Sequence, residues 1–281
     1  MDTVSTCWPT WKSEIWNSMP SGLSAKGLIN ELGTSLSRVF SSTNMAGRNQ
    51  SSQSGAGTAW EALICWYLNI CLIGTQAVVI KKTSHVPMPI REALTVMYGT
   101  VKTNTESDLV AITLPEDSIL DGYSKQYFSV GRVKFDDRLS SLLAQVEVCI
   151  IQCKTNWNEN AQIPMLWDLI YSATGFQSGR ASVGINGHTV KALRRFAYAF
   201  ATVPTNRLEG YNRNSSPVLR VTNLSGGNYW GREALNGVAS SLPDIFTKNF
   251  FAATQNLGLP WKNHLNDELR DYKDKYSYFS L

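Results

Sequence analysis

Several features that would assign a protein class at once are missing from this chain of 281 residues. Its five cysteines include no C-x-x-C pair, and its three histidines, His85, His188 and His264, are far apart in the sequence. A structural zinc site is therefore not expected, because such sites usually combine closely spaced ligand pairs. The odd number of cysteines, most of them inside apolar segments, indicates buried thiols in a reducing compartment rather than a disulfide framework.

Long hydrophobic runs are also missing. The longest apolar run, AWEALICWYLNICLIG, contains Glu61 and Asn69. It is shorter than the roughly 20 residues that a membrane-spanning helix needs. The first residues, MDTVSTCWPTWKSEIW, show no basic region followed by an apolar stretch, so no secretory signal is expected. These absences predict a soluble cytoplasmic protein with no membrane partner.

Charge of one sign is present only in mild excess. The formal net charge is +4, and basic residues gather at Lys81-Lys82, around Arg194-Arg195 and between Arg207 and Arg220. Such clusters fit a polyanionic partner, and they fit ordinary solvated faces equally well. Charge alone therefore leaves both interpretations open.

The hydrophobic pattern, with 43% hydrophobic residues, provides for a sizeable core. It predicts an amphipathic helix in 21–40, a mobile polar loop over 41–57 and a buried helix over 58–72. Strands are predicted in the ranges 76–82, 107–115, 127–135, 144–154 and 196–204, with a helix at 160–173. In the last third we expect a strand, a glycine-rich turn and more helix. This order indicates an α/β fold with a central mixed β-sheet flanked by helices.

The stretch VEVCIIQCKTNWN, from Val146, places a lysine at the end of a strand that otherwise reads as buried. Side chains alternate along a strand, so Gln152 and Lys154 share one face, while Glu147 points to the other. A lone Gln-x-Lys is a weak signal, because strands often finish with polar residues where they reach the surface. The alternative is that both side chains serve a site.

A carboxylate lies upstream at the start of another apolar strand, where Asp108 precedes LVAITL. If the two strands are neighbours, Asp108, Gln152 and Lys154 converge. Carboxylate and amide oxygens are hard ligands that suit Mg²⁺, and a lysine can orient an attacking water or offset charge on a phosphate. The combination therefore indicates metal-assisted phosphodiester chemistry.

The pattern resembles the PD-(D/E)xK nuclease superfamily, which has an acidic residue on one strand and Glu-x-Lys, sometimes Gln-x-Lys, on the next. Asp108, Gln152 and Lys154 match these positions, over a segment from about residue 55 to 205. Members often carry a glutamate on the helix before the first core strand, and Glu61 in GAGTAWEALICWYLN occupies that place. The resemblance implies a restriction-endonuclease-like core.

This sequence departs from the family pattern at two points. No proline precedes Asp108, although that proline is often absent in the family. Gln152 replaces the usual glutamate and removes one negative charge from the metal site. Weaker metal binding is expected unless Glu61 supplies the missing carboxylate. For Glu61 alone, the alternative is a carboxylate near a helix N-terminus that interacts with the helix dipole.

Two polar segments have both a functional and an ordinary interpretation. Asn156, Asn158 and Asn160, which surround Trp157, would contact phosphates or adenine edges, or would simply form a turn. LSGGNYWGR, from Leu224, suits close approach to nucleic acid, or a turn packed on the core. GAGTAWE is not a P-loop, because no Gly-Lys-Ser/Thr follows it.

From the resemblance we expect three parts: a helical segment with a mobile polar loop at 1–54, a catalytic core at 55–205, and an extension at 206–281 that contacts DNA or forms a dimer. The leading hypothesis is a sequence-specific, Mg²⁺-dependent endonuclease of the type II restriction class. It would act as a homodimer on double-stranded DNA, with Asp108, Gln152, Lys154 and Glu61 as site residues. The alternatives are a repair or modified-DNA nuclease of the same fold, and a non-catalytic DNA-binding or assembly protein.

Overall fold

A computed structural model of the chain describes residues 3–18, 25–42, 50–72, 75–103, 107–121, 132–155, 181–202, 216, 219 and 227–231. The helices are α1 (Thr3–Ser18), α2 (Ala25–Ser41), α3 (Gln50–Cys71), α4 (Met88–Ala93), α5 (Ser118–Asp121) and α6 (Arg132–Ser141). Short 3-10 helices span Thr83–His85, Leu143–Gln145 and Val190–Ala192. The strands are β1 (Ala77–Ile80), β2 (Val96–Tyr98), β3 (Val101–Thr103), β4 (Leu109–Thr113), β5 (Glu147–Lys154), β6 (Ala181–Val183), β7 (Arg195–Thr202) and β8 (Gly227–Gly231).

Five of the strands form one mixed sheet in the order β1-β4-β5-β7-β8. The pairs β1 with β4 and β4 with β5 are antiparallel, whereas β5, β7 and β8 run parallel. The other three strands form a small antiparallel sheet in the order β3-β2-β6. The predicted α/β fold with a central mixed sheet is confirmed.

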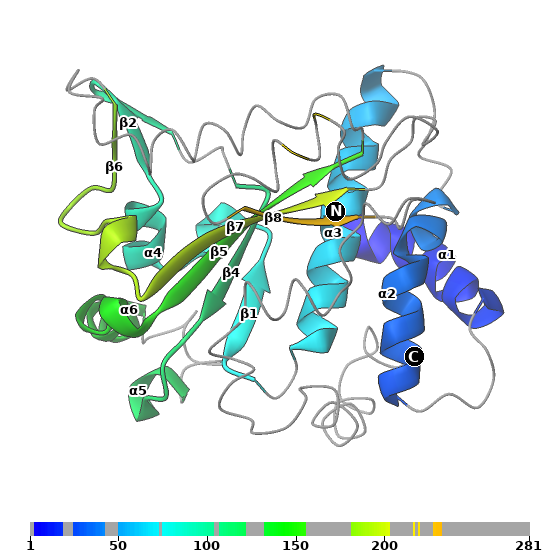
Figure 1. Cartoon of the computed structure of the whole chain (residues 1–281), viewed down its shortest axis with the longest axis horizontal. Coiled ribbons are helices and arrows are strands. Elements are labelled where there is room, and N and C mark those ends of the chain that lie inside the picture. The colour runs from blue at the N-terminus through cyan, green and yellow to red at the C-terminus, as the bar shows by residue number, and fades with distance from the viewer. Residues whose placement is uncertain are drawn as a thin grey trace.

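Helices cover both faces of the large sheet, with α1 to α3 on one side and α4 to α6 on the other (Figure 1). On the first side, α3 packs against odd-numbered strand residues such as Leu109, Ile151 and Ala199. Two edge-on aromatic pairs, Trp8 with Trp66 and Phe40 with Trp60, join α1 and α2 to α3. Burial of side chains of this size is worth roughly 1.5–3 kcal/mol each and makes α3 a fixed platform.

The opposite face is a second apolar cluster. Val110, Ile112, Val148 and Ile150 point into it and pack against residues of α4 and α6, among them Ile90 and Leu139. The alternation predicted for the strand at 144–154 is therefore confirmed, since Cys149 and Ile151 face α3 while Val148 and Ile150 face away. Each face of β5 is buried, which explains why its sequence is a nearly continuous apolar run.

Asn69, a polar residue inside the buried helix α3, bonds to the backbone of the edge strand β1. Its Nδ2 donates to the Val79 carbonyl oxygen at 2.8 Å, and its Oδ1 accepts from the Val79 N–H at 3.0 Å. Among the described strands, β1 has a hydrogen-bonded neighbour only on its β4 side. The side chain thus closes part of an open sheet edge and fixes β1 against α3.

Two predicted elements differ from the structure. Helix α3 begins at Gln50, so 50–57 is helical rather than part of a loop. The strand predicted at 127–135 is wrong where the structure describes it, because α6 begins at Arg132. In α6 the spacing of Phe135 and Leu139, both buried, follows the helical period, and Val133 is 72% exposed. The apolar residues alternate along the sequence, but their burial follows the helix.

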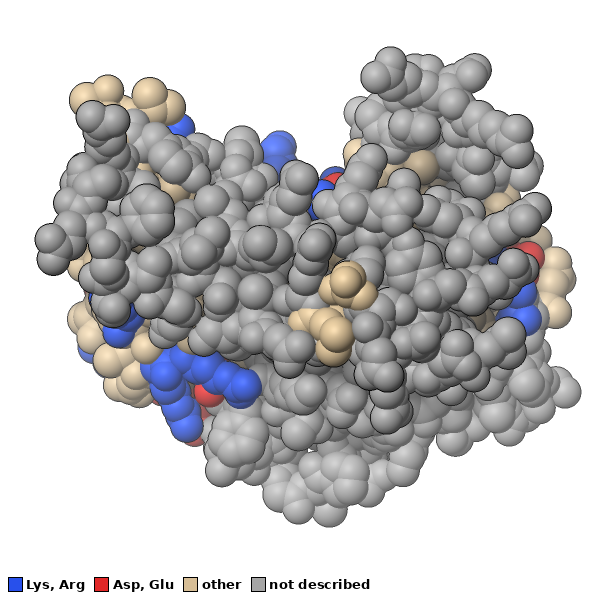
Figure 2. All heavy atoms as spheres, turned by 45° about the horizontal axis from the view of Figure 1, so that its top comes forward, with Lys and Arg blue, Asp and Glu red and all other residues tan. Residues whose placement is uncertain are grey.

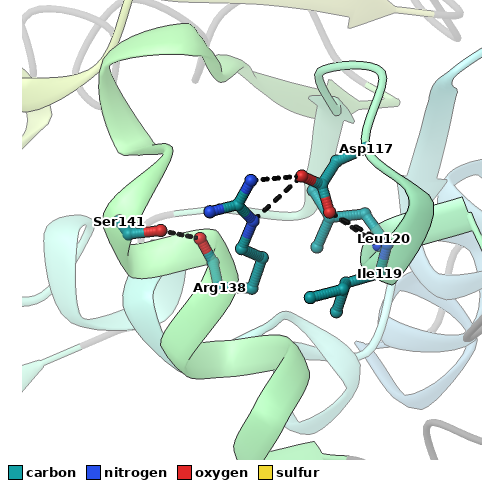
Figure 3. A network of polar contacts seen from close by, with 5 residues as sticks. All are labelled: Asp117, Ile119, Leu120, Arg138 and Ser141. Atoms are coloured by element: carbon teal, nitrogen blue, oxygen red, sulfur yellow. Dashed lines mark hydrogen bonds and ion pairs between the residues drawn. The ribbon is translucent and has the colours of Figure 1, made fainter.

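An ion pair holds α6 to the short helix α5 (Figure 3). Arg138 donates from Nε and a terminal nitrogen to Asp117 Oδ2, at 2.9 and 2.6 Å. The other oxygen of Asp117 accepts from the backbone N–H groups of Ile119 and Leu120, which caps the first turn of α5. Arg138 holds the pKa of the Asp117 carboxyl below its usual range, and the two N–H groups lower it further.

The remaining expectations have mixed outcomes. Helix α2 and strands β1, β4, β5 and β7 lie where the sequence predicts them. Gly227–Gly231, which lies within the segment LSGGNYWGR, forms strand β8. The helix at 160–173 and the elements expected after residue 231 lie outside the described residues. All five cysteines are thiols, and among the described residues no helix is long and apolar enough to cross a membrane.

Candidate active site

Several strands of the large sheet begin or end along the same edge, which runs across the strands and differs from the open edge beside β1. Because β1 and β5 both run antiparallel to β4, the last residues of β1 and β5 lie beside the first residue of β4. The parallel strands β7 and β8 end at the same edge. Polar residues that follow or precede these strands are therefore brought together, although they are far apart in the sequence.

Asp108 stands at this edge, directly before β4. Its Oδ2 accepts a hydrogen bond from the backbone N–H of Cys153 in β5, at 2.7 Å. The β4–β5 pairing ends at Leu109 with Ile151, and the Asp108 carboxylate follows directly after it. A backbone donor on a rigid strand thus fixes one oxygen of Asp108, and this bond is charge-assisted.

Lys154 approaches the same carboxylate from the end of β5. Its Nζ lies 3.9 Å from Asp108 Oδ2, and the lysine side chain is 27% exposed. The predicted convergence of Asp108 and Lys154 is therefore present in the structure. This distance is at the long end of the range for an ion pair. The ammonium group also contacts solvent, so it is available to bind a ligand.

Glu61 points to this edge from the middle of α3. Its Oε2 lies 3.0 Å from Nζ of Lys81, the residue after β1. Burial raises the pKa of the Glu61 carboxyl, and the charge of Asp108 raises it further. The hydrogen bond from Lys81 and the charges of Lys81 and Lys154 oppose this rise. Glu61 is therefore electrostatically coupled to both Asp108 and Lys154.

The helix-dipole interpretation of Glu61 does not hold. α3 begins at Gln50, three turns before this residue. The dipole acts within the first turn of a helix, so it does not reach Glu61. Lys81 is the group that balances this carboxylate.

Gln152 occupies a different position from the other site residues. It is 1% exposed and belongs by alternation to the face of Val148 and Ile150, whereas Glu61 lies on the α3 side. Alternation therefore places Glu61 and Gln152 on opposite faces of the sheet. The sequence spacing does not show this separation, because it gives no information on where α3 packs.

Sequence reasoning missed two members of this cluster, Lys81 and Cys153. Lys81 was noted only as part of a basic pair, but Ala77 and Val79 face α3, and continued alternation points Lys81 the same way. Cys153 lies buried between the charged groups. Burial, followed by the negative charges of Asp108 and Glu61, raises the pKa of its thiol well above the usual range. It is a neutral spacer and not a nucleophile.

The donor set suits a magnesium ion that keeps part of its water shell. Mg²⁺ is usually held by one or two carboxylates together with substrate phosphates and waters. Asp108 and Glu61 supply two coupled carboxylates at one edge. Within the described part of the chain no group of three or more His, Cys, Asp and Glu side chains forms a closed metal cage. An open site of two carboxylates is the arrangement that these residues offer.

Basic surface residues keep both of their interpretations. Figure 2 shows a face on which Lys and Arg side chains gather in a group that includes acidic side chains. In the basic cluster around Arg194-Arg195, Arg194 is exposed, and its Nε lies 3.8 Å from Glu147 Oε1. Asn156 to Asn160 with Trp157, and Arg232, lie outside the described residues.

Neither a scan of the chain against protein-family models nor a search among curated proteins finds a match.

Proposed function

We propose that the protein is a Mg²⁺-dependent endonuclease that cleaves double-stranded DNA, with a restriction-endonuclease-like core. The observation that carries the proposal is the approach of Asp108 and Lys154, from neighbouring strands, to 3.9 Å at one edge of a mixed sheet. A carboxylate fixed by a backbone donor and a solvent-accessible ammonium are the minimal pair for holding a cation and a phosphate side by side.

The order of elements also supports the proposal. A glutamate-bearing helix, α3, precedes the first strand, β1, and the acidic residue and the Gln-x-Lys segment follow on the paired strands β4 and β5. A further strand, β7, lies parallel to β5. This is the arrangement that the resemblance to the PD-(D/E)xK superfamily implies for residues 55–205.

In this proposal each residue has a separate task. Magnesium, when bound, supplies charge neutralisation and an activated water. Asp108 and Glu61 would hold the cation, and the amide oxygen of Gln152 would assist from the opposite face. Lys154 would contact the scissile phosphate or orient the attacking water. The bond from the Cys153 N–H keeps Asp108 in place while the phosphate binds.

Plasmid cleavage tests the proposal. Supercoiled plasmid with Mg²⁺ is expected to give discrete fragments with the unaltered protein and none with Asp108→Asn or Lys154→Met. Lys82→Met is the matched control, since Lys82 is exposed and follows Lys81 directly. Smeared or structure-dependent products would instead favour a repair or modified-DNA nuclease. Intact plasmid with well-folded protein would favour a non-catalytic DNA-binding or assembly role and overturn the proposal.

We further propose that the active form is a homodimer on palindromic DNA, with the extension at 206–281 contributing to dimer or DNA contacts. Two-fold symmetric proteins match two-fold symmetric sites. Sedimentation of the full chain with and without a DNA duplex measures the stoichiometry. A monomer that cuts both strands of one site would contradict this part of the proposal and leave the nuclease activity itself intact.

A further inference from the structure

A second group of polar side chains lies away from the sheet edge just described. A continuous chain of hydrogen bonds connects Ser140 of α6 to His188, and His188 to Glu92 of α4. His188 Nε2 lies 2.6 Å from Ser140 Oγ, and His188 Nδ1 lies 2.7 Å from Glu92 Oε2. Figure 1 shows α4, α6 and β6 gathered on the side of the large sheet opposite α1 to α3.

One tautomer of the imidazole satisfies every contact in this chain. An ionised carboxylate only accepts hydrogen bonds, so the tautomer with its proton on Nδ1 donates to Glu92. Nε2 is then an acceptor, and the hydroxyl of Ser140 donates to it. A base that accepts from a serine hydroxyl, and is oriented by a carboxylate, is the arrangement that activates serine as a nucleophile.

The backbone holds His188 in this position. Asn186 and Gly187 have φ of 53° and 82°, and the His188 N–H donates to the Ile185 carbonyl at 2.9 Å. Positive φ at both central residues is typical of the tight Asn-Gly hairpin turn. Gly184 also has a positive φ, and a Cβ there would clash with the His188 carbonyl oxygen. The turn therefore fixes the position of the imidazole ring relative to the sheet and helices around it.

The carboxylate is held as firmly as the imidazole. Asn186 Nδ2 donates to Glu92 Oε1 at 2.7 Å, so each Glu92 oxygen has its own partner. The side chains of Glu92 and His188 are only 14% and 15% exposed, which limits competition by water. Three segments far apart in the sequence, α4, α6 and the 184–188 turn, therefore converge on one serine.

We propose that Ser140, His188 and Glu92 form a second catalytic site, which transfers acyl groups from ester substrates and is separate from the proposed nuclease site. Ser140 Oγ forms a bond to the ester carbonyl carbon, and its proton passes to His188 Nε2. The bond to the alcohol then breaks, and His188 returns the proton to the departing alkoxide. Water, activated by the same imidazole, releases the acid and restores the serine.

The neighbouring serine provides a matched control. Ser141 follows Ser140 in α6, but its hydroxyl donates to the Arg138 carbonyl at 2.7 Å (Figure 3). It has no such contact to the imidazole and is expected to be unreactive. The two serines share a helix and a sequence neighbourhood but differ in hydrogen-bond partner. Ser141 is also the more exposed of the two, so selective labelling of Ser140 would reflect its contact with His188 and not easier access for the reagent.

The experiment treats the full-length protein with a fluorophosphonate probe and locates the modified residue by peptide mass spectrometry. Phosphonylation is expected at Ser140 and to persist in Ser141→Ala. His188→Gln is expected to slow labelling at least ~100-fold, the range for loss of a general base. Glu92→Gln, which keeps the shape, should slow it too, and p-nitrophenyl acetate hydrolysis should fall in parallel.

Three results would overturn the proposal: no labelling at Ser140, equal labelling of Ser140 and Ser141, or an unchanged rate in His188→Gln. Circular dichroism of each variant establishes that it is folded, and Glu92→Gln provides the same test if His188→Gln does not fold. Plasmid cleavage measured on the same samples keeps this result separate from the nuclease proposal, because the two sites share no residue.

Discussion

Lys81 Nζ lies 3.0 Å from Glu61 Oε2, and beside this pair Lys154 faces Asp108 across 3.9 Å. The sheet edge therefore holds two carboxylates whose charges are balanced by two ammonium groups. The carboxylates are close enough that the charge of Asp108 raises the pKa of Glu61. A divalent cation bound by these carboxylates would have to compete with the lysines.

Lys81→Met is expected to tighten Mn²⁺ binding about fivefold at pH 8. The substitution removes a competing charge, and for a pair whose side chains are 31% and 22% exposed this is worth about 1 kcal/mol, because solvent screens the attraction. Because Lys81 lowers the pKa of Glu61, its removal favours the protonated carboxyl, so binding is measured at an alkaline pH. Electron paramagnetic resonance of free Mn²⁺ measures the affinity, with Lys82→Met as the control. Unchanged or weaker binding in Lys81→Met would remove Lys81 from the site.

Asp108 has a structural task that can be separated from its proposed chemical one. Asp108→Ala leaves the Cys153 N–H without its acceptor and is expected to cost about 1–3 kcal/mol of unfolding free energy. Asp108→Asn keeps an acceptor oxygen and should lose less than half of that. Urea unfolding of both variants measures the difference. Equal destabilisation would show that the Cys153 bond does not stabilise the fold.

DNA binding should depend steeply on salt if the basic residues contact phosphates. Each neutralised phosphate releases counterions, so affinity should fall by at least about tenfold between roughly 50 and 200 mM salt. Fluorescence anisotropy with a labelled duplex in Ca²⁺, which prevents turnover in many Mg²⁺ nucleases, gives the slope. A flat response would count against double-stranded DNA as the partner.

The sequence predicted the part of the site that depends on local periodicity. Alternation along β5 correctly separated Ile150 from Cys149 and Cys153. The pairing of the strands that carry Asp108 and Lys154 was also correct, because both are short, apolar and bounded by polar residues. These features are properties of one or two strands.

What the sequence could not give was the packing of distant segments. The ion pair of Lys81 with Glu61 depends on how α3 lies over β1, which no local pattern encodes. The spacing of the histidines argues only against a zinc site, and it does not show that His188 contacts Ser140 and Glu92 from two other segments. The strand predicted at 127–135 is wrong for the same reason, because contacts of α6 with the sheet favour a helix there.

Asn69→Leu should destabilise the protein by about 2–4 kcal/mol. Two backbone groups of Val79 lose their partners at the edge of the sheet, and each unsatisfied group costs roughly 1–3 kcal/mol. Thermal or urea unfolding measures the loss. Asn17→Leu is the control, because Asn17 is exposed and bonds only to Ser13 in its own helix among the contacts described. Similar stabilities for the two variants would contradict the role of Asn69.

The Asp117–Arg138 pair predicts an acid-dependent contribution to stability. The pKa of Asp117 is lower in the folded protein than its value of about 4 in an unfolded chain, chiefly because Arg138 donates to it. A carboxyl with a depressed pKa stabilises the fold above its unfolded pKa, and this contribution is lost as the pH falls through the folded pKa. Asp117→Asn should therefore lower the melting temperature at pH 7, and the difference should shrink as the pH falls below the unfolded value of about 4.

Melting curves at pH 7, 5 and 3 test this directly, with Asp137→Asn as the control. Asp137 is an exposed carboxylate on α6, on the same helix as Arg138. Its removal should change the melting temperature little at any of these pH values. If Asp117→Asn melts with the unaltered protein at pH 7, or if its deficit persists undiminished at pH 3, the ion pair does not couple α5 to α6 as the geometry indicates. If lowering the pH reduces the melting-temperature deficit of Asp117→Asn alone, the acid sensitivity comes from the Asp117–Arg138 pair.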